Sequence, residues 1–374
     1  MNKSKRKIVK VCHVTSAHSR YDLRIFRKEC CSLAKSGFEV TYLVNDTKPN
    51  EIIDNVNIVS TNFLPKSRLD RWFASKSFLR KKMIDIDADL YHFHDPDLLP
   101  LAKWIEKLGK ISIFDSHEDV PQQILDKTYI PKTFRLFVSY IYSKYELFVI
   151  KNISGVVVAT PHMVKRFKRS NYNVSVVTNY PIVKDKQVRT HKNTLRKICF
   201  AGSIDHRWNH DKIINAINEI DNIEYLLAGN SRTKYFENLE KLPGWAKVRF
   251  LGRIPFEQVT EMYNESIVGL AFLGDNGLTN EKGTLGVTKI FEYMEAGLPF
   301  ICTSCDDWKE IIDRYHCGIA IETTNTYEVK NAIERIVNDT ILANQMGKNG
   351  REAIEKIYNW ESQASILLQV YKSI

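Results

Sequence analysis

The chain alternates short apolar stretches with helical patterns, and this alternation runs through most of its length. Residues 7–14 and 38–44 have the continuous apolar character of buried parallel strands, and residues 22–35 carry apolar side chains at helical spacing between them. Further strands are expected at residues 57–60, 90–94, 111–115, 155–159 and 174–178. Strands that alternate with helices in this way predict a doubly wound parallel α/β sheet.

The pattern restarts after residues 181–194, a polar and charged segment without periodicity that indicates a linker. New strands are expected at residues 197–201, 223–228, 248–251, 268–273 and 300–303. A chain of 374 residues is long enough for two domains. We therefore expect two Rossmann-like domains, residues 1–180 and 195–357, followed by a helix over residues 358–374. Ligands are expected in a cleft at the carboxyl ends of the strands.

Positive charge is concentrated in the first half of the chain. Residues 1–190 contain 33 Lys and Arg against 19 Asp and Glu, whereas residues 191–374 contain 21 against 25. Residues 63–83 interleave seven cations with aromatic and leucine side chains, and residues 163–169 add four more cations. This pattern favours an anionic membrane surface over nucleic acid, because no nucleic-acid-binding module is recognisable. A solvated basic face without a partner is the alternative.

Other features indicate a cytoplasmic protein. No run of about 18 uninterrupted apolar residues occurs, so we expect no transmembrane helix. The basic residues 1–10 lead into a strand broken by polar side chains, which is not the pattern of a signal peptide. The seven cysteines form no regular framework and are typical of a reducing compartment. Cys302 and Cys305 are interpreted as buried structural residues, because no second cysteine pair lies near them.

The most informative stretch is residues 286–299, where a glycine-containing turn opens a helix and Gly-x-Pro closes it before a buried strand. The unpaired N–H groups of a helix N-terminus suit a diphosphate. Lys289 is unfavourable in the first turn of an isolated helix, and an anionic ligand would explain it. Glu292 could accept hydrogen bonds from a ribose. The predicted site comprises Gly286, Val287, Thr288, Lys289 and Glu292; a surface lysine and glutamate on an ordinary helix are the alternative.

The sequence Lys289-Ile-Phe-Glu-Tyr-Met-Glu-Ala-Gly-Leu-Pro299 resembles the donor-binding helix and following strand of glycosyltransferase family 4. Members of that family are retaining enzymes with the GT-B fold. The resemblance implies an N-terminal acceptor domain, a C-terminal nucleotide-sugar domain and a last helix that crosses back to the first domain. The second Glu of the family's Glu-x7-Glu pair, which holds the ribose, falls on Glu292. The first falls on Thr284, and Glu281 is the nearest substitute.

Shorter stretches extend the resemblance along the donor domain. Residues 200–204 resemble its first strand and turn, and residues 226–230 and 248–253 resemble the strands whose ends frame the base. The implied donor contacts are Gly202, Ser203, Gly229, Asn230 and Arg253. The family usually places an Arg and a Lys after the first strand, where this chain has Ser203 and Asn209. Arg207 is the nearest cation, and with Lys289 it would stabilise the departing phosphate; a solvated loop arginine is the alternative.

In the first domain, residues 14–29 are similar to the opening of a bacterial branch of the family that builds surface polysaccharides. Residues 111–118 look like the strand that ends in the family's active-site histidine, here His117, which would orient a sugar hydroxyl. Arg20, Arg24 and Glu118 are predicted to face the acceptor. The two arginines would bind its diphosphate, because guanidinium groups bind phosphate bidentately; a local pair of Arg24 with an acidic neighbour is the alternative.

His92, His94 and Asp97 have a spacing that suggests metal ligands. We interpret them otherwise, because strand residues that face alternate sides do not converge on one ion. The resembled family is also generally metal-independent. We therefore expect neither a metal nor a cofactor.

The resemblance implies a retaining glycosyltransferase that moves a sugar from a nucleotide diphosphate donor. The resemblance also favours a UDP-sugar as this donor. The expected acceptor is a polyprenyl-diphosphate-linked glycan in the synthesis of O-antigen or capsule, at the inner face of the plasma membrane. Front-face displacement needs positioning residues rather than an acid–base pair. Two alternatives remain: a sugar-nucleotide epimerase of the same fold, and a non-catalytic protein that binds a sugar nucleotide.

Overall fold

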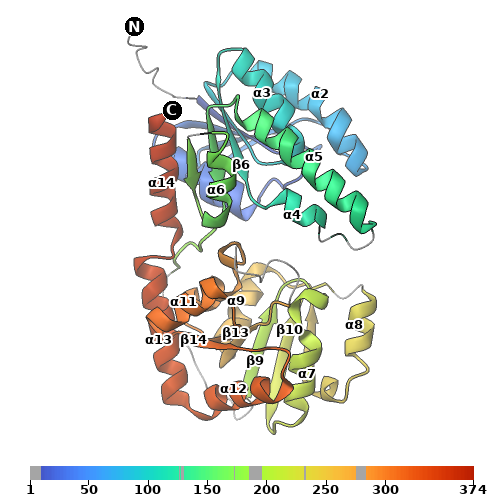
Figure 1. Ribbon diagram of the computed structural model, residues 1–374. Helices are drawn as coiled ribbons and strands as arrows, with labels where there is room; N and C mark the ends of the chain where they lie inside the picture. The colour runs from blue at the N-terminus through green and yellow to red at the C-terminus, as the bar shows by residue number, and fades with distance from the viewer. Residues whose placement is uncertain are drawn as a thin grey trace. The chain divides into compact units, whose positions relative to one another are not determined.

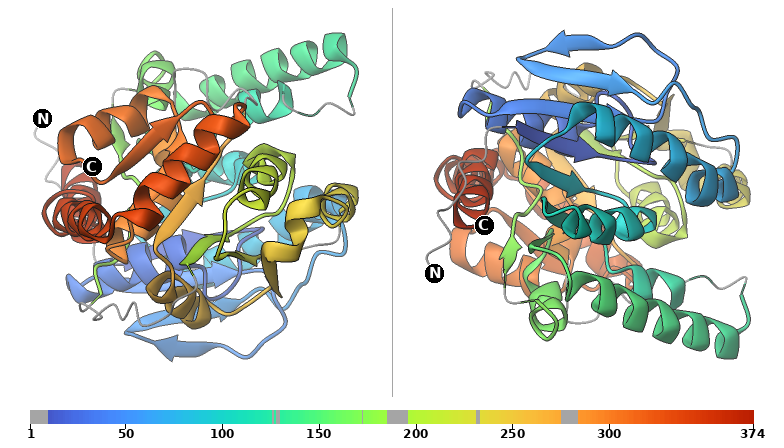
Figure 2. Two further views of the ribbon diagram at one scale, coloured as in Figure 1. Left: turned by 90° about the horizontal axis from the view of Figure 1, so that it is seen from below. Right: turned by 90° about the horizontal axis from the view of Figure 1, so that it is seen from above.

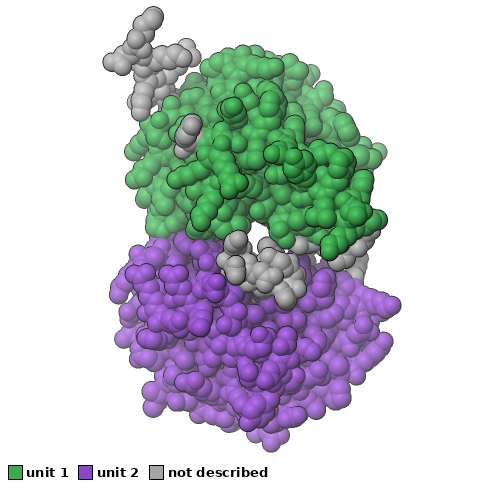
Figure 3. Space-filling model, viewed as in Figure 1, with its two compact units in different colours: residues 1–179, 360–374 green, residues 180–359 purple. Residues whose placement is uncertain are grey.

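The computed structural model describes residues 10–125, 127, 130–171, 173–184, 196–230, 233–274 and 284–374. The chain forms two compact units (Figures 1 and 3). Unit 1 comprises Met1–Asn179 and Trp360–Ile374, and unit 2 comprises Tyr180–Asn359. Each unit is built on its own, mainly parallel sheet with helices packed against it, which confirms the predicted α/β class.

Unit 1 contains an eight-stranded sheet in the order β3-β4-β2-β1-β5-β6-β7-β8. Its strands are β1 Lys10–Val14, β2 Glu39–Val44, β3 Glu51–Ile53, β4 Val56–Ser60, β5 Leu90–Phe93, β6 Ile111–Ser116, β7 Gly155–Val158 and β8 Val174–Val176. Its helices are η1 Leu23–Cys30, α1 Cys31–Lys35, α2 Arg68–Ile86, η2 Pro96–Leu98, α3 Leu99–Lys107, α4 Val120–Leu125, α5 Lys132–Ile150, η3 Pro161–Met163, α6 Val164–Lys168 and α14 Trp360–Ser373.

The sheet of unit 1 is covered on both faces, and β1 shows why. Cys12 and Val14 point into a core shared with α2, α3 and α5, whereas Val11 points into a core shared with η1, α1 and α14. Successive strand residues face opposite sides, so a strand buried on both sides is mainly apolar. Figure 2 shows the two helical layers on either side of the strands.

Two local features of unit 1 were not expected from the sequence. Strand β3 pairs antiparallel with β4 at the sheet edge, and the residues between them, Asp54 and Asn55, both have positive φ. This is the backbone of a tight two-residue hairpin turn. The helix that follows β1 opens as a π-helix, in which the Arg27 N–H donates to the carbonyl of Asp22 at 3.1 Å.

Unit 2 contains a six-stranded parallel sheet in the order β11-β10-β9-β12-β13-β14. Its strands are β9 Arg196–Ala201, β10 Ile223–Ala228, β11 Val248–Gly252, β12 Val268–Ala271, β13 Phe300–Thr303 and β14 Gly318–Ile321. Its helices are η4 His206–Trp208, α7 His210–Asn218, α8 Lys234–Leu239, η5 Pro243–Lys247, α9 Phe256–Glu265, η6 Thr284–Gly286, α10 Lys289–Glu295, α11 Asp306–Tyr315, α12 Thr326–Asn338 and α13 Thr340–Lys356.

A single core joins the strands of unit 2 to the helices on both faces. Cys302 and Cys305 are buried in this core, as predicted. Within the described ranges, every helix is too short or too polar to span a bilayer.

Candidate active site

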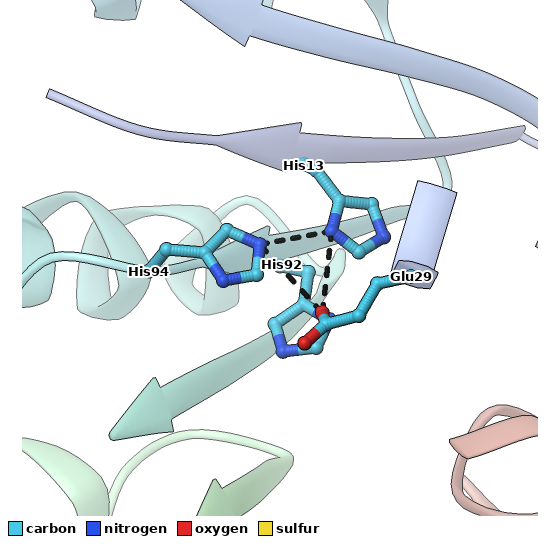
Figure 4. Close-up of side chains that lie close together, drawn as sticks. All are labelled: His13, Glu29, His92 and His94. Atoms are coloured by element: carbon cyan, nitrogen blue, oxygen red, sulfur yellow. Dashed lines mark hydrogen bonds and ion pairs between the residues drawn. The ribbon is translucent and has the colours of Figure 1, made fainter. Parts of the chain in front are cut away.

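Polar side chains gather at the carboxyl ends of β1, β5 and β6 in unit 1. His13 lies on β1 directly opposite His92 on β5, and their ring centroids are 4.8 Å apart. His94 follows β5 and stacks on His92 at 4.7 Å between centroids (Figure 4). The expectation that His92 and His94 diverge is wrong, because side chains alternate with a period of two and residues i and i+2 therefore share a face.

A chain of hydrogen bonds connects this cluster to His117, which follows β6. Asp115 Oδ2 lies 2.9 Å from Nε2 of His117, and Nδ1 of His94 lies 3.2 Å from the same nitrogen. On its other side, His94 Nε2 lies 2.9 Å from Nδ1 of His13. The side chain of His117 is 17% exposed, whereas those of His94 and Asp115 are fully buried. His117 is therefore the member of this chain that a ligand can reach.

Tyr371 of α14 continues the chain inside the unit. Its hydroxyl lies 3.1 Å from Nε2 of His13 and 2.7 Å from Nδ1 of His92. The last helix thus packs a polar side chain against the strands that carry the histidines.

Arg24, which the sequence predicts to contact the acceptor's diphosphate, lies under this cluster. Its Nη2 donates to both carboxylate oxygens of Asp115 at 3.0 Å, and its Nε lies 3.1 Å from Oε1 of Glu29. Arg20 lies elsewhere and is also buried: its five N–H donors are used by Asp46, Glu51 and two backbone carbonyls. For either arginine, a contact with an acceptor phosphate would require these pairs to open.

The two carboxyl groups beside Arg24 differ in charge. Burial opposes ionisation of Asp115, but Arg24 and the hydrogen bonds from His117 and His94 hold its pKa well below the ordinary value. Burial and the neighbouring Asp115 raise the pKa of Glu29 well above its ordinary value. A single guanidinium therefore faces one carboxylate and one neutral acid, which avoids two buried negative charges on one cation.

Sequence analysis did not identify His18, which lies in the loop after β1. Its ring centroid is 5.2 Å from that of His117, and its Nδ1 lies 3.2 Å from Oδ2 of Asp22. Burial lowers the pKa of His18, but Asp22 and Asp95 more than offset this and raise it above its ordinary value. The only feature of the sequence that could have indicated His18 is its place in a polar loop after a buried strand. Glu118 is exposed next to His117 and accepts a hydrogen bond from Gln123.

Two sets of these side chains have the composition of a metal site: His13, Glu29, His92 and His94, and His94, Asp115 and His117. In each set, one ligand atom from each residue lies within 4.8 Å of the others. Hydrogen bonds link the histidines and Asp115 of these sets to one another or to Tyr371, and Glu29 pairs with Arg24.

In unit 2, the predicted donor contacts at the ends of β9, β10 and β11 line one pocket of about 290 Å³. They are Gly202, Ser203, Gly229, Asn230 and Arg253. The backbone approaches itself closely here: a Cβ at Gly229 would lie 2.1 Å from the carbonyl oxygen of Gly202. Glycine is required at this approach, and it keeps the strand ends open to a ligand.

Lys289, at the start of α10, lies beside this pocket. A Cβ atom built on Gly202, which lines the pocket, would lie 3.2 Å from Cε of Lys289. Its Nζ lies 2.6 Å from Oε2 of Glu292. Thr288 and Tyr263 also donate to Glu292, at 2.7 and 3.0 Å. Burial opposes ionisation of Glu292, but these three donors lower its pKa. Among the described residues, these donors occupy three of about four acceptor positions of the carboxylate, which leaves a position on Oε1.

The remaining predicted donor residues surround α10 and β9. Gly286 ends η6 and is exposed, and Val287 is half-buried against the core. Arg207 in η4 is half-exposed and makes a bidentate pair with Asp205, at 2.9 and 2.7 Å. Glu281 lies outside the described residues. Tyr263, which sequence analysis missed, comes from α9 and carries no local motif.

A basic and aromatic face covers one side of unit 1. Helices α2, α3 and α5 lie side by side there (Figure 2), with Arg80 over Trp104 at 4.4 Å and Lys103 over Phe148 at 4.0 Å. On α5, five large apolar side chains form an exposed stripe at helical spacing: Phe134, Phe137, Ile141, Tyr145 and Phe148. Helix α5 therefore does not bury all of its large apolar side chains against the core.

Comparison with known protein families gives a match for each half of the chain. Residues 182–353 match the model of glycosyl transferases group 1, and residues 24–180 match that of glycosyltransferase family 4. An uncharacterised glycosyltransferase of Methanocaldococcus jannaschii is 25% identical over 175 residues, 47% of each chain. The matched segment thus spans about half the length of that relative.

Solved structures extend the likeness to the whole chain. Sucrose-phosphate synthase from Thermosynechococcus elongatus is 16% identical, with 98% of both chains covered and a TM-score of 0.74. Anabaena HepE in complex with UDP and glucose is 12% identical, with 98% of this chain and 100% of that chain covered and a TM-score of 0.70. These likenesses confirm the predicted GT-B fold.

Proposed function

Because the chain belongs to the glycosyltransferases of group 1 and family 4, we propose that it transfers a sugar from a nucleotide diphosphate donor bound by unit 2. The observation that carries this proposal is the pocket at the ends of β9, β10 and β11, with Lys289 beside it. The ends of parallel strands are where such sheets bind nucleotides. The pocket combines a close backbone approach with two nearby cations, Lys289 and Arg253, which suits a diphosphate.

In this assignment, Glu292 binds a ribose hydroxyl through the acceptor position that remains on Oε1. Lys289 then bridges Glu292 and the phosphates. Arg207 supplies a second positive charge when it leaves Asp205. The donor is a UDP-sugar; the Anabaena protein of the same fold, solved with UDP and glucose, supports this base.

The reaction proceeds with retention. The bond between the anomeric carbon and the donor's terminal phosphate oxygen breaks, and a bond to the acceptor hydroxyl oxygen forms on the same face of the sugar. The departing phosphate takes the acceptor's proton, so no strong protein base is needed. His117 orients the sugar, and Lys289 with Arg207 stabilises the negative charge that develops on the phosphate.

The acceptor is a lipid-linked glycan of a surface polysaccharide, and the enzyme works as a peripheral protein on the cytoplasmic face of the membrane. The stripe on α5 and the cations of α2 support this part, because exposed apolar side chains among Lys and Arg suit anionic lipid. Helix α5 itself also carries Lys132, Arg135 and Lys144.

A panel of sugar nucleotides tested by thermal unfolding and by mass detection of products decides between the candidates. A matched donor at 100 times its Kd should add about 2.7 kcal/mol to the free energy of unfolding. A transferase releases nucleoside diphosphate and extends a lipid acceptor. An epimerase isomerises the donor without an acceptor, and a binding protein changes neither. A complete panel without a stabilising nucleotide would refute the proposal.

A further inference from the structure

Arg71 on α2 differs from the other arginines near the strand ends of unit 1. The side chains of Arg20 and Arg24 are 3% and 7% exposed and donate to carboxylate oxygens at 2.7 and 3.0 Å. Arg166 pairs with two carboxylates. The side chain of Arg71 is 30% exposed, and among the described residues its nearest carboxylate oxygen is Oδ1 of Asp97, 3.7 Å from Nε. That distance is too long for a hydrogen bond.

The hydrogen-bond donors of Arg71 are therefore left over by the fold. Its Nε is buried and has no hydrogen-bond partner within the described part of the chain, and the same holds for Oδ1 of Asp97. Nη1 and Nη2 also make no hydrogen bond with a described residue, and they are not among the buried unpartnered atoms, so they are open to solvent. Their four N–H groups form the fork that binds a phosphate group bidentately.

Arg71 lies at the same strand ends as His117. Oδ2 of Asp97, next to Arg71, accepts a hydrogen bond from Oγ of Ser16 at 2.8 Å. Ser16 belongs to the loop after β1, and the same loop carries His18, whose ring centroid lies 5.2 Å from that of His117. A ligand held by Arg71 is thus bound at the edge of the sheet where ligands of such folds are expected.

The first residues of α2 place a second cation and apolar side chains around Arg71. Arg68 is exposed and precedes Arg71 by three positions, so the two side chains are neighbours on the helix surface. Like charges at this spacing disfavour a helix, and an anion bound between them would remove that cost. Leu69, Trp72 and Phe73 are 71%, 42% and 73% exposed. Cations beside exposed apolar side chains suit a ligand with an anionic head and a hydrocarbon chain.

We propose that Arg71, together with Arg68, binds the diphosphate that joins the lipid of the acceptor to its first sugar. The three exposed apolar side chains beside them contact the start of the lipid chain. This inference rests on the proposed function for the nature of the acceptor. It assigns the acceptor's diphosphate to α2 and not to the two internal arginines that the sequence suggested, because their donors are already used inside unit 1.

The test is isothermal titration calorimetry of the full-length protein with farnesyl diphosphate, an isoprenoid diphosphate without a sugar, in saturating UDP. Arg71→Gln should weaken binding about 10- to 100-fold, since it removes charged hydrogen bonds to phosphate. Arg71→Lys keeps the charge but loses the fork, and should weaken binding about three- to 10-fold. The matched control is Arg80→Gln, in which the replaced arginine lies over Trp104 on the same helix. It should change binding less than about twofold.

Two further measurements identify the source of the phosphate. Farnesol should bind Arg71→Gln and the unsubstituted protein equally, because it lacks the diphosphate. Arg71→Gln and Arg80→Gln should weaken co-sedimentation with phosphatidylglycerol vesicles to the same extent, since each removes one cation from a basic surface. A loss of vesicle binding specific to Arg71→Gln, with unchanged binding of farnesyl diphosphate, would overturn the proposal, because Arg71 would then bind lipid headgroups.

Three other results would overturn it: no binding of farnesyl diphosphate to the unsubstituted protein, equal losses in Arg71→Gln and Arg80→Gln, or binding that Lys289→Met abolishes. The last result would place the diphosphate in the pocket of unit 2, and it is informative even if UDP does not bind. If Arg71→Gln does not fold, Arg71→Lys decides.

This inference and the proposed function fail separately. Binding of farnesyl diphosphate that depends on Arg71, in a protein that binds no sugar nucleotide, would refute the transferase and leave the diphosphate site on α2. In an active transferase, Arg71→Gln should raise the KM of the lipid acceptor at least about 10-fold while the donor KM changes less than about twofold. An unchanged acceptor KM would refute the role of Arg71 and leave the transferase in place.

Discussion

Nε of Arg24 lies 3.1 Å from Oε1 of Glu29, although the two residues are five positions apart on one helix. In an α-helix with 3.6 residues per turn, side chains five apart point about 140° away from each other. Here the helix opens with π-type hydrogen bonding, which widens the turn until positions i and i+5 share a face. The unusual turn thereby brings Arg24, Glu29 and Asp115 together beneath His117.

Arg24→Ala should lower the free energy of unfolding by about 3–5 kcal/mol, because it leaves the Asp115 carboxylate buried without its cation. Urea denaturation measures this loss. The control is Arg27→Ala on the same helix, whose pair with Asp54 is half-exposed and should cost about 0–1 kcal/mol. Similar losses in the two variants would contradict the internal role of Arg24.

Asp22 should make unfolding pH-dependent in acid. Burial opposes its ionisation, but hydrogen bonds from His18 and from the backbone of Ile25 and Arg24 lower its pKa from 3.8 to about 2. A lowered carboxyl pKa stabilises the fold above pH 4, and the stabilisation is lost as the pH falls through about 2. Asp22→Asn should therefore cost on the order of 2 kcal/mol at pH 5 and progressively less toward pH 2.

Asn preserves the helix cap, so this variant isolates the charge of Asp22. Asp22→Ala removes the cap as well and should cost about 1 kcal/mol more at every pH. A difference between Asp22→Asn and the unsubstituted protein that stays constant from pH 2 to 6 would exclude a lowered pKa.

The two sheets could be predicted because most of their strands are buried on both faces and are therefore mainly apolar. The π-helical opening could not be predicted, since residues 22–35 fit α-helical spacing equally well. The grouping of His13, His92 and Tyr371 depends on β1 lying next to β5 and on α14 packing against them. Strand order and helix docking are tertiary properties that no local pattern encodes.

The pocket that we propose for the donor was easier to locate from the sequence, because its glycines follow predicted strands directly. The partners of Glu292 were not predictable in the same way. Thr288 and Lys289 are its helical neighbours, but Tyr263 comes from another helix and reaches Glu292 through the packed interior. Sequence therefore indicates which residues lie at the strand ends, and packing determines how many of their hydrogen-bonding positions remain for a ligand.

Lys289→Met should weaken the binding of UDP about 10- to 100-fold and leave uridine binding unchanged, since a charged hydrogen bond to phosphate contributes about 1.5–3 kcal/mol. Isothermal titration calorimetry with the two ligands measures the difference. Lys330→Met serves as the control, because Lys330 pairs with Glu219 at 3.0 Å and is not among the described residues that line the pocket. Equal losses for UDP and uridine would remove Lys289 from the phosphate site.

His117→Ala should lower the rate of transfer about 100-fold or more while the Kd of the donor nucleotide changes little, because in the proposed function the histidine orients the sugar and does not hold the nucleotide. Transfer rates and nucleotide affinity are measured on the same preparation. His162→Ala, in η3 and hydrogen-bonded to Thr160, controls for the loss of an imidazole elsewhere in unit 1. Normal turnover in His117→Ala would exclude the residue from the reaction.

The stripe on α5 should bind anionic vesicles. Phe134 and Phe137 are 57% and 60% exposed, and complete burial of such side chains contributes about 1.5–3 kcal/mol each. Partial insertion of both should make the double variant Phe134→Ser, Phe137→Ser bind vesicles about 10-fold more weakly in co-sedimentation at low salt. Ile341→Ser is the control, because Ile341 is 84% exposed on α13 of unit 2. Binding that is lost equally in both variants, or absent from the unsubstituted protein, would refute membrane docking through α5.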